Sequence, residues 1–198
     1  MKSVERYAVF ELEIAGTSGE CQDADITACF RNGDQAKADK ITMKGFYAGN
    51  GKAIIRFMPE LEGVWNYTAT WGEISVEGSF RCIANQGQNH GPVRADGMHF
   101  RYADGTRFIP MGTTCYAWIH QTEQLQEQTL ATLQKSAFNK VRMCVFPKSM
   151  NYNRNDPDCY PFERDALGNW EISKPDSSFW EKLEKRIMQL GELGIEAD

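Results

Sequence analysis

Hydrophobic and polar residues alternate along the first 84 positions of the chain. The alternating apolar positions fall in three runs: Phe10, Leu12 and Ile14; Ile26, Ala28 and Phe30; Trp65, Tyr67, Ala69 and Trp71. A period of two is typical of strands with one buried face. Asn32-Gly33 and Asn50-Gly51 supply turn signals between such runs. The pattern predicts a β-sandwich over residues 1–84, with Trp65, Tyr67 and Trp71 in its core rather than on an exposed glycan-binding face.

A polar, glycine-bearing segment at 85–92 ends in Pro92 and is predicted to be a linker. Two short β segments follow, at 93–102 and 107–110. Asp96-Gly97 and Asp104-Gly105 mark their turns. These segments are predicted to form a hairpin at the start of a second domain, over residues 93–198.

Beyond residue 107 the pattern becomes strand, helix, strand. Residues 108–114 are predicted to be a strand, and Leu130, Leu133 and Ala137 the apolar face of a helix. Residues 141–146 are almost continuously apolar, which is typical of a strand buried on both faces. A parallel sheet is expected, because a helix joins the two strands.

A long polar loop at 148–176 separates this unit from a second helix. Ser178 and Glu181 match a capping box at the start of that helix. Its predicted apolar face consists of Phe179, Leu183, Ile187 and Leu190. Gly191 and Gly194 are placed to end the helix, and residues 195–198 lead into a third strand. The order strand, helix, strand, loop, helix, strand predicts the opening of a βα-repeat fold.

Arg142 is the single charge inside the apolar run 141–146. A guanidinium group stays protonated, so a buried one requires an anion or several acceptors. Asp165 and Glu196 are candidates for a purely structural pairing. Strand alternation places Arg142 on the face opposite Val141 and Met143.

Composition excludes several classes of function. The net charge is −5 and no basic run with interleaved aromatic residues occurs, so no nucleic acid partner is expected. No stretch approaches the roughly 20 apolar residues of a membrane span. The N-terminus has no apolar signal core, which predicts a cytoplasmic protein. Six cysteines without a Cys-x-x-Cys pair and three histidines predict free thiols and no metal.

Four motifs resemble a known family: FIPMGTTCYAWIHQ, FNKVRMCVFPK, DPDCYPFERD and LGIEAD. In that order behind a small β-sandwich, they resemble bacterial glycoside hydrolases. Those proteins join an N-terminal immunoglobulin-like domain to an apiosidase- or cellulase-like TIM barrel. The resemblance implies an immunoglobulin-like β-sandwich followed by the first βα units of an incomplete (β/α)8 TIM barrel. It also implies the N-terminal part of an enzyme that cleaves glycosidic bonds without a cofactor.

The same resemblance assigns Arg142 the task of orienting the nucleophilic carboxylate. The two catalytic glutamates are expected beyond residue 198, so this chain alone is expected to be inactive. Self-association through the incomplete barrel is also expected. The alternative function is a non-catalytic β-sandwich module that binds glycan or docks a partner domain.

Five residues are predicted to bind the carbohydrate substrate: Tyr116, Trp118, His120, Lys148 and Tyr152. An aromatic ring can stack on a sugar, and an imidazole can bond a hydroxyl group. For Trp118 and His120 a purely structural role, filling the top of the barrel and capping a turn, is equally consistent with the sequence. Most aromatic residues of the loop 148–176 are interpreted as anchors that hold the loop down.

Overall fold

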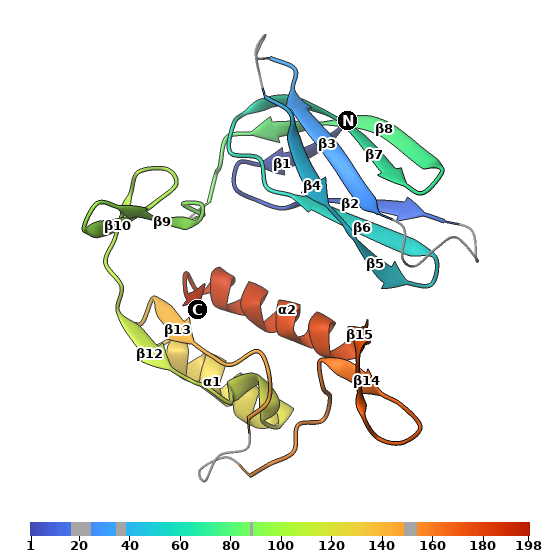
Figure 1. The fold of residues 1–198 in the computed structure, drawn as a ribbon. Coiled ribbons are helices and arrows are strands. Elements are labelled where there is room, and N and C mark those ends of the chain that lie inside the picture. Colours follow the sequence, from blue (N-terminus) through green and yellow to red (C-terminus); the bar gives the residue numbers. More distant parts are fainter. Residues whose placement is uncertain (17–24, 35–38, 88, 149–153) are drawn as a thin grey trace. The chain divides into compact units, whose positions relative to one another are not determined.

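A computed structural model describes residues 1–16, 25–34, 39–87, 89–148 and 154–198. The chain divides into two compact units, Met1–Phe108 and Ile109–Asp198 (Figure 1).

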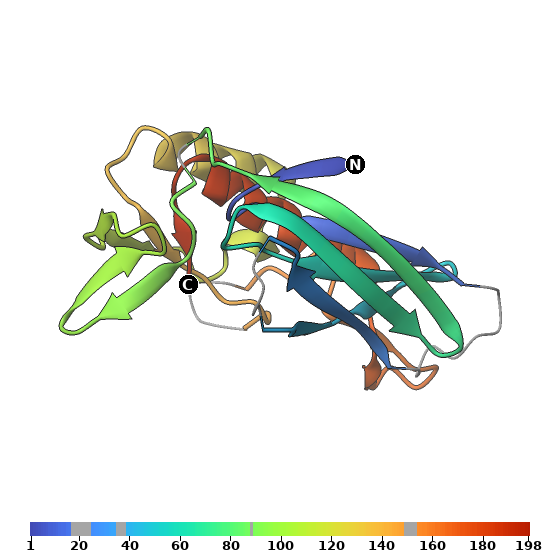
Figure 2. The same ribbon diagram turned by 90° about the horizontal axis from the view of Figure 1, so that it is seen from above.

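Eight of the described strands in the first unit form two sheets. The five-stranded sheet has the order β1-β8-β7-β3-β4, and the three-stranded sheet has the order β2-β6-β5. The strands are β1 (Lys2–Glu5), β2 (Phe10–Ala15), β3 (Ile26–Asn32), β4 (Ile41–Lys44), β5 (Phe46–Gly49), β6 (Lys52–Phe57), β7 (Gly63–Trp71) and β8 (Ile74–Ile83). β1 pairs with β8 in parallel, whereas the other described pairs within these two sheets are antiparallel. The long β7–β8 hairpin is seen from above in Figure 2.

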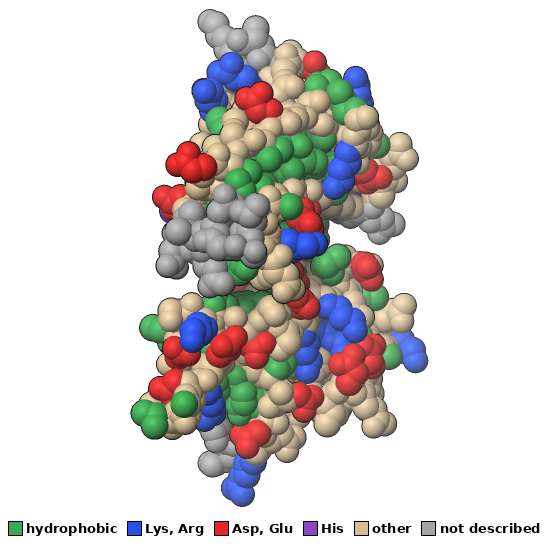
Figure 3. All heavy atoms as spheres, turned by 90° about the vertical axis from the view of Figure 1, so that its right-hand side faces the viewer, with side chains coloured by type: hydrophobic (Ala, Val, Ile, Leu, Met, Phe, Trp, Pro, Cys, Tyr) green, Lys and Arg blue, Asp and Glu red, His purple; other side chains and the backbone are tan. Residues whose placement is uncertain are grey.

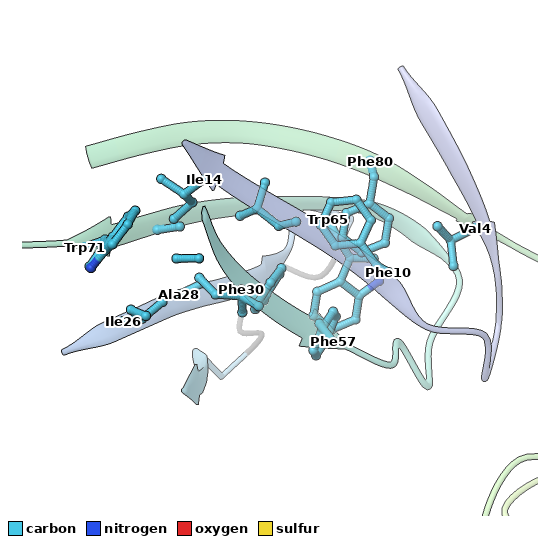
Figure 4. Close-up of a cluster of buried hydrophobic side chains, with 14 of the residues drawn as sticks. Val4, Phe10, Ile14, Ile26, Ala28, Phe30, Phe57, Trp65, Trp71 and Phe80 are labelled. Carbon is cyan, nitrogen blue, oxygen red and sulfur yellow. The ribbon is translucent and has the colours of Figure 1, made fainter. Parts of the chain in front are cut away.

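Both sheets contribute side chains to one buried core (Figure 4). The rings of Phe10 and Phe80 stack with centroids 4.0 Å apart, and those of Phe30 and Phe57 stack at 4.2 Å. Each stack joins a strand of the three-stranded sheet to a strand of the five-stranded sheet. The first unit is therefore held together as a β-sandwich by aromatic contacts between its layers.

The alternation read from the sequence matches this packing. Phe10, Leu12 and Ile14 are buried along β2, with exposed residues between them. Trp65 and Trp71 are buried in β7, which confirms their placement in the core. Asn50, with φ of 53°, lies in the turn between β5 and β6, as the Asn-Gly signal predicted.

A small antiparallel sheet follows the sandwich. It consists of β9 (Val93–Asp96), β10 (His99–Tyr102) and β11 (Arg107–Phe108), so the predicted hairpin is confirmed. The division at residue 108 groups these strands with the first unit. The domain boundaries predicted at 84 and 93 stay predictions.

The second unit combines three short parallel strands with two α-helices and a hairpin. Its elements are β12 (Gly112–Thr114), the 3-10 helix η1 (Trp118–His120), α1 (Glu123–Leu133), β13 (Lys140–Arg142), β14 (Phe162–Arg164), β15 (Trp170–Pro175), α2 (Ser177–Glu192) and β16 (Glu196–Ala197). β13 pairs in parallel with β12 on one side and β16 on the other. β14 and β15 form a separate antiparallel pair.

The prediction of the first βα units of a TIM barrel is wrong. The described residues form mostly small sheets with two α-helices, and no series of barrel βα repeats is present among them. The apolar run 141–146 gives only a three-residue strand that ends at Arg142, and Phe146 is 53% exposed. A short apolar run cannot by itself distinguish a strand from a packed loop. An antiparallel hairpin, not a βα unit, then occupies much of the predicted loop.

Three local predictions are also corrected. The run 108–114 is divided, because Phe108 pairs with β10 and Gly112–Thr114 pairs with β13. Helix α1 ends at Leu133, which leaves Ala137 outside it. The cap of α2 is Asp176 rather than Ser178, since the Asp176 carboxylate accepts from the Ser178 backbone N–H at 2.9 Å.

Helix α2 buries an arginine where the sequence favoured Ile187. Ile187 is 41% exposed, whereas Arg186 is fully buried. Nε of Arg186 donates to Oε1 of the buried Gln126 at 2.8 Å, and Nη2 lies 2.8 Å from a carboxylate oxygen of Glu123. Nη1 contacts Glu127. These partners from α1 offset the desolvation of the guanidinium and join the two helices.

Arg186→Ala is expected to destabilise the second unit by about 3 kcal/mol, because Gln126 would lose its buried partner and a cavity would form. Hydrogen exchange of the α2 amides measures the effect. Lys185→Ala is the matched control, since this neighbouring side chain is 59% exposed and lies 3.6 Å from the same Glu123. The control should change stability by less than about 0.5 kcal/mol. Equal effects of the two variants would contradict the structural role of Arg186.

Candidate functional site

The carboxyl ends of β12, β13 and β16 lie side by side in the parallel sheet. The ladder continues past the strands, because Cys115 N–H donates to the carbonyl of Arg142 and Met143 N–H donates to that of Asp198. In open parallel sheets, ligands bind at this edge. This edge is therefore the candidate site of the second unit.

Strand β13 separates an apolar face from a charged face. Val141 is fully buried in a hydrophobic cluster with Leu130 of α1 and Leu190 of α2. Lys140 and Arg142, one position to either side, project from the opposite face. The prediction that Arg142 lies opposite Val141 agrees with this arrangement.

Arg142 is not buried, however. Its side chain is 60% exposed, and its Nε donates to Oδ2 of Asp198 at 2.9 Å. Lys140 Nζ lies 3.4 Å from the other carboxylate oxygen of Asp198. The anion is thus Asp198 rather than Asp165, whose carboxylate accepts backbone hydrogen bonds within its own turn.

The charges on this face shift one another's titration. The hydrogen bond from Arg142 lowers the pKa of Asp198, and Lys140 adds to this effect. Asp198 raises the pKa of Arg142, with a smaller contribution from Tyr116. Burial raises the pKa of the Glu196 carboxyl, although Lys140 opposes it. The face therefore holds two carboxyl groups with pKa values moved in opposite directions, beside two cations.

The predicted substrate residues Trp118 and His120 lie in the interior. Each is 3% exposed. The indole Nε1 of Trp118 donates to the carbonyl of Gln126 at 3.1 Å. The His120 ring stacks on Phe179, with the centroids 6.1 Å apart. This geometry favours the packing alternative for both residues, since neither ring presents a face to solvent.

The remaining predicted residues are distributed differently. Tyr116 is 43% exposed and interacts with Arg142, so these two predicted site residues are brought together. Lys148 is exposed. Tyr152 lies outside the described residues. The role of each in substrate binding stays a prediction.

Sequence reasoning missed Lys140 and Asp198 as members of this charged face. The sequence does indicate which positions share a face. Positions 140 and 142 lie on the same face of one strand, and positions 196 and 198 lie on the same face of the next strand. What the sequence did not provide was the register, which places Lys140 opposite Glu196.

The loop aromatics pack against neighbouring side chains. The rings of Tyr160 and Trp170 lie 4.8 Å apart, and the Arg164 guanidinium lies 3.9 Å from the centroid of Trp170. Figure 3 shows charged side chains of both signs interspersed with hydrophobic ones on one face of the molecule.

Among the described residues, no group of three or more His, Cys, Asp or Glu side chains is arranged to hold a metal ion.

Five cysteines fall within the described ranges, and all five are free thiols: Cys29, Cys82, Cys115, Cys144 and Cys159. Burial raises the thiol pKa of Cys82, Cys115 and Cys159. Raised pKa values lower the thiolate fraction, so these three are poor nucleophiles.

The chain is similar to one described protein family and to a solved structure. Residues 3–72 match the family described as a domain of unknown function (DUF5060). The whole chain is 42% identical to a solved structure of "a putative glycoside hydrolase from Bacteroides vulgatus ATCC 8482", with a TM-score of 0.90. The match covers 100% of this chain and 41% of that one. A comparison with curated proteins gives no match.

In the parts of the chain that the structure describes, neither α-helix has the length and apolar character to cross a membrane.

Protonation of His120 is expected to destabilise the second unit. Nε2 lies 3.1 Å from the carbonyl of Cys144 and therefore carries the proton, whereas the buried Nδ1 has no hydrogen-bond partner among the described residues. Burial lowers the pKa of His120 from its ordinary value of 6.5, and the charge of Lys182 adds to this. The folded state therefore prefers neutral imidazole. The contribution of neutral His120 to the free energy of unfolding is fully present above pH 6.5. It is lost as the pH decreases through the pKa of His120 in the folded state.

Hydrogen exchange of α2 between pH 7.5 and 5 tests this expectation. Protection should fall with pH in the wild-type protein and stay nearly constant in His120→Gln. His99→Gln removes an exposed histidine of β10 and serves as the control, which should behave as the wild type does. A pH dependence that persists in His120→Gln would assign the effect to another group.

Proposed function

We propose that this chain is the N-terminal part of a glycoside hydrolase that cleaves glycosidic bonds in a carbohydrate substrate. The observation that carries the proposal is the 42% identity, along the entire chain, to a protein described as a putative glycoside hydrolase. An immunoglobulin-like description of the sandwich and an apiosidase- or cellulase-like activity belong to the same proposal. They rest on the sequence resemblance.

Glycosidases use two carboxyl groups, about 5 Å apart for retention and about 6.5–9.5 Å apart for inversion of configuration. The catalytic pair is proposed to lie in the part of the complete enzyme that this chain does not cover. Cofactors are not needed for this reaction.

Arg142 is proposed to position the nucleophilic carboxylate of the complete enzyme. Its guanidinium has five N–H donors, of which Nε already donates to Asp198. A side chain that is 60% exposed can present its outer donors to an added carboxylate. Asp198 holds the guanidinium in place, and Tyr116 borders it.

The alternative is a non-catalytic module in which the sandwich binds glycan or docks a partner domain. The family match is confined to residues 3–72, within the β-rich first unit. This supports the alternative, because the matched family covers the sandwich and not the second unit. Carbohydrate is the proposed partner in either case, and self-association stays a prediction.

Activity separates the two functions. The 198-residue chain should not hydrolyse aryl glycosides, whereas a longer protein that contains it should release the aryl group from at least one of a panel. Turnover by the short chain that is abolished by Glu196→Gln would place the catalytic carboxyls on the charged face of β16 and contradict the proposal. A longer protein without activity on any glycoside would favour the module.

Arg142→Lys in the longer protein should lower kcat by roughly 10–100-fold, by analogy with the loss seen for outer-shell groups that orient metal ligands. Lysine keeps the charge but lacks the planar fork that binds a carboxylate through two bonds. The melting temperature should change little, because Arg142 is largely exposed. Arg101→Lys, which alters an exposed arginine 3.6 Å from Asp96, is the control. A large loss of stability with unchanged kcat in the folded fraction would show a structural role instead.

A further inference from the structure

The outer face of the five-stranded sheet carries a groove that the proposed catalytic function does not use. Its volume is about 750 Å³, within the usual range of ligand pockets. The walls come from β3, β4, β7 and β8, whose inner faces form the sandwich core. The groove therefore lies on a rigid sheet rather than on loops.

Polar side chains form regular rows across the groove. Adjacent strands in a sheet lie about 4.8 Å apart, and every second residue along a strand repeats after about 6.8 Å. Strand pairing therefore fixes a grid of hydrogen-bonding groups on this face. Across β3, β7 and β8 the rows that line the groove are Thr27–Thr70, Cys29–Thr68–Glu77 and Arg31–Asn66–Ser79.

Most of these side chains are short, and several are already oriented. The hydroxyl oxygens of Thr27 and Thr70 lie 3.1 Å apart, and Thr68 Oγ1 donates to Glu77 Oε1 at 3.4 Å. Short side chains on strands have little rotamer freedom to lose when a ligand binds. These side chains can therefore form hydrogen bonds to a ligand with little loss of side-chain conformational entropy.

Aromatic stacking contributes little here. Tyr67 is the one aromatic residue among the described groove residues, and its ring lies 5.5 Å from Phe10 and 5.9 Å from Phe30 in the core. Recognition in this groove must therefore depend on hydrogen bonds.

The chemistry of the lining selects the ligand. Threonine, serine and asparagine both donate and accept, as sugar hydroxyl groups do. The negative charge of Glu77 partly balances the positive charges of Arg31 and Lys40. The electrostatic potential of the groove therefore does not strongly favour a polyanion. Phosphate-rich ligands would need a cluster of cations instead.

We propose that this groove binds a segment of a neutral polysaccharide and holds the substrate polymer close to the enzyme. The choice of carbohydrate rests on the proposed function, whereas the groove and its polar grid are properties of the sandwich alone. Glu77 would accept from two hydroxyl groups, and Asn66 and Arg31 would donate to the ring and glycosidic oxygens.

Affinity electrophoresis of the 198-residue chain tests the proposal. The gels contain xylan, arabinan or hydroxyethyl cellulose as neutral probes, or polygalacturonate as an anionic one. At least one neutral polymer should retard the wild-type chain. The double variant Asn66→Ala/Glu77→Ala should bind that polymer at least about tenfold more weakly.

Glu13→Ala is the matched control, because it removes a carboxylate from the outer side of the other sheet, where Glu13 pairs with Lys52 at 2.9 Å. It should bind as the wild type does. Failure of every neutral polymer to retard the chain, retardation by polygalacturonate alone, or full binding by the double variant would each overturn the proposal.

Cys29 provides a second readout at the centre of the grid. The bound neutral polymer should slow alkylation of Cys29 by iodoacetamide, while Cys115, Cys144 and Cys159 of the second unit react at unchanged rates. Unchanged alkylation of Cys29 under saturating polymer would place binding elsewhere.

Hydrolysis is scored separately, with small aryl glycosides and the longer protein. A longer protein that hydrolyses these compounds while the 198-residue chain binds no neutral polymer would contradict only the groove. Polymer binding by the chain without hydrolysis by the longer protein would contradict only the proposed catalytic function.

Discussion

Strand β13 is paired on both sides, and the second unit depends on that pairing. A three-residue strand offers little burial of its own, but β12 and β16 satisfy its backbone and fix which side chains face inward. Val141 is thereby committed to the hydrophobic cluster, and Lys140 and Arg142 to the opposite face. The same register brings Asp198 to Arg142. One ladder thus sets both the packing of the helices and the charge arrangement of the candidate site.

Burial of polar groups is the second constraint on this unit. Arg186 and Gln126 are both fully buried, and the cost is offset because they hydrogen-bond to each other. His120 is only half satisfied, with one ring nitrogen bonded and the other without a partner among the described residues. The sandwich core is mostly apolar and aromatic, and its buried Asn32 donates to the carbonyl of Glu62 at 3.0 Å.

Sequence reasoning succeeded where a local pattern determines the structure. Phe10, Leu12 and Ile14 alternate with glutamates, and only one face of a strand can bury them. It failed where the structure depends on distant partners. The run after Val141 is apolar enough for a longer strand, yet strand β13 ends at Arg142. The burial of Trp118 and His120, which depends on Gln126 and Phe179, cannot be read from the sequence either. The partner of Arg142 was missed for the same reason.

The parallel pairing of β1 with β8 constrains when the sandwich can form during synthesis. Lys2 is opposite Phe80, so the first strand of the chain waits for a partner made much later. At roughly 5–20 residues per second, translation takes about 4–16 s to cover that interval. Antiparallel neighbours such as β7 and β8 can pair as soon as both leave the ribosome. β1 therefore cannot join this sheet until β8 has been made, and until then its backbone groups stay open to pairing with other chains.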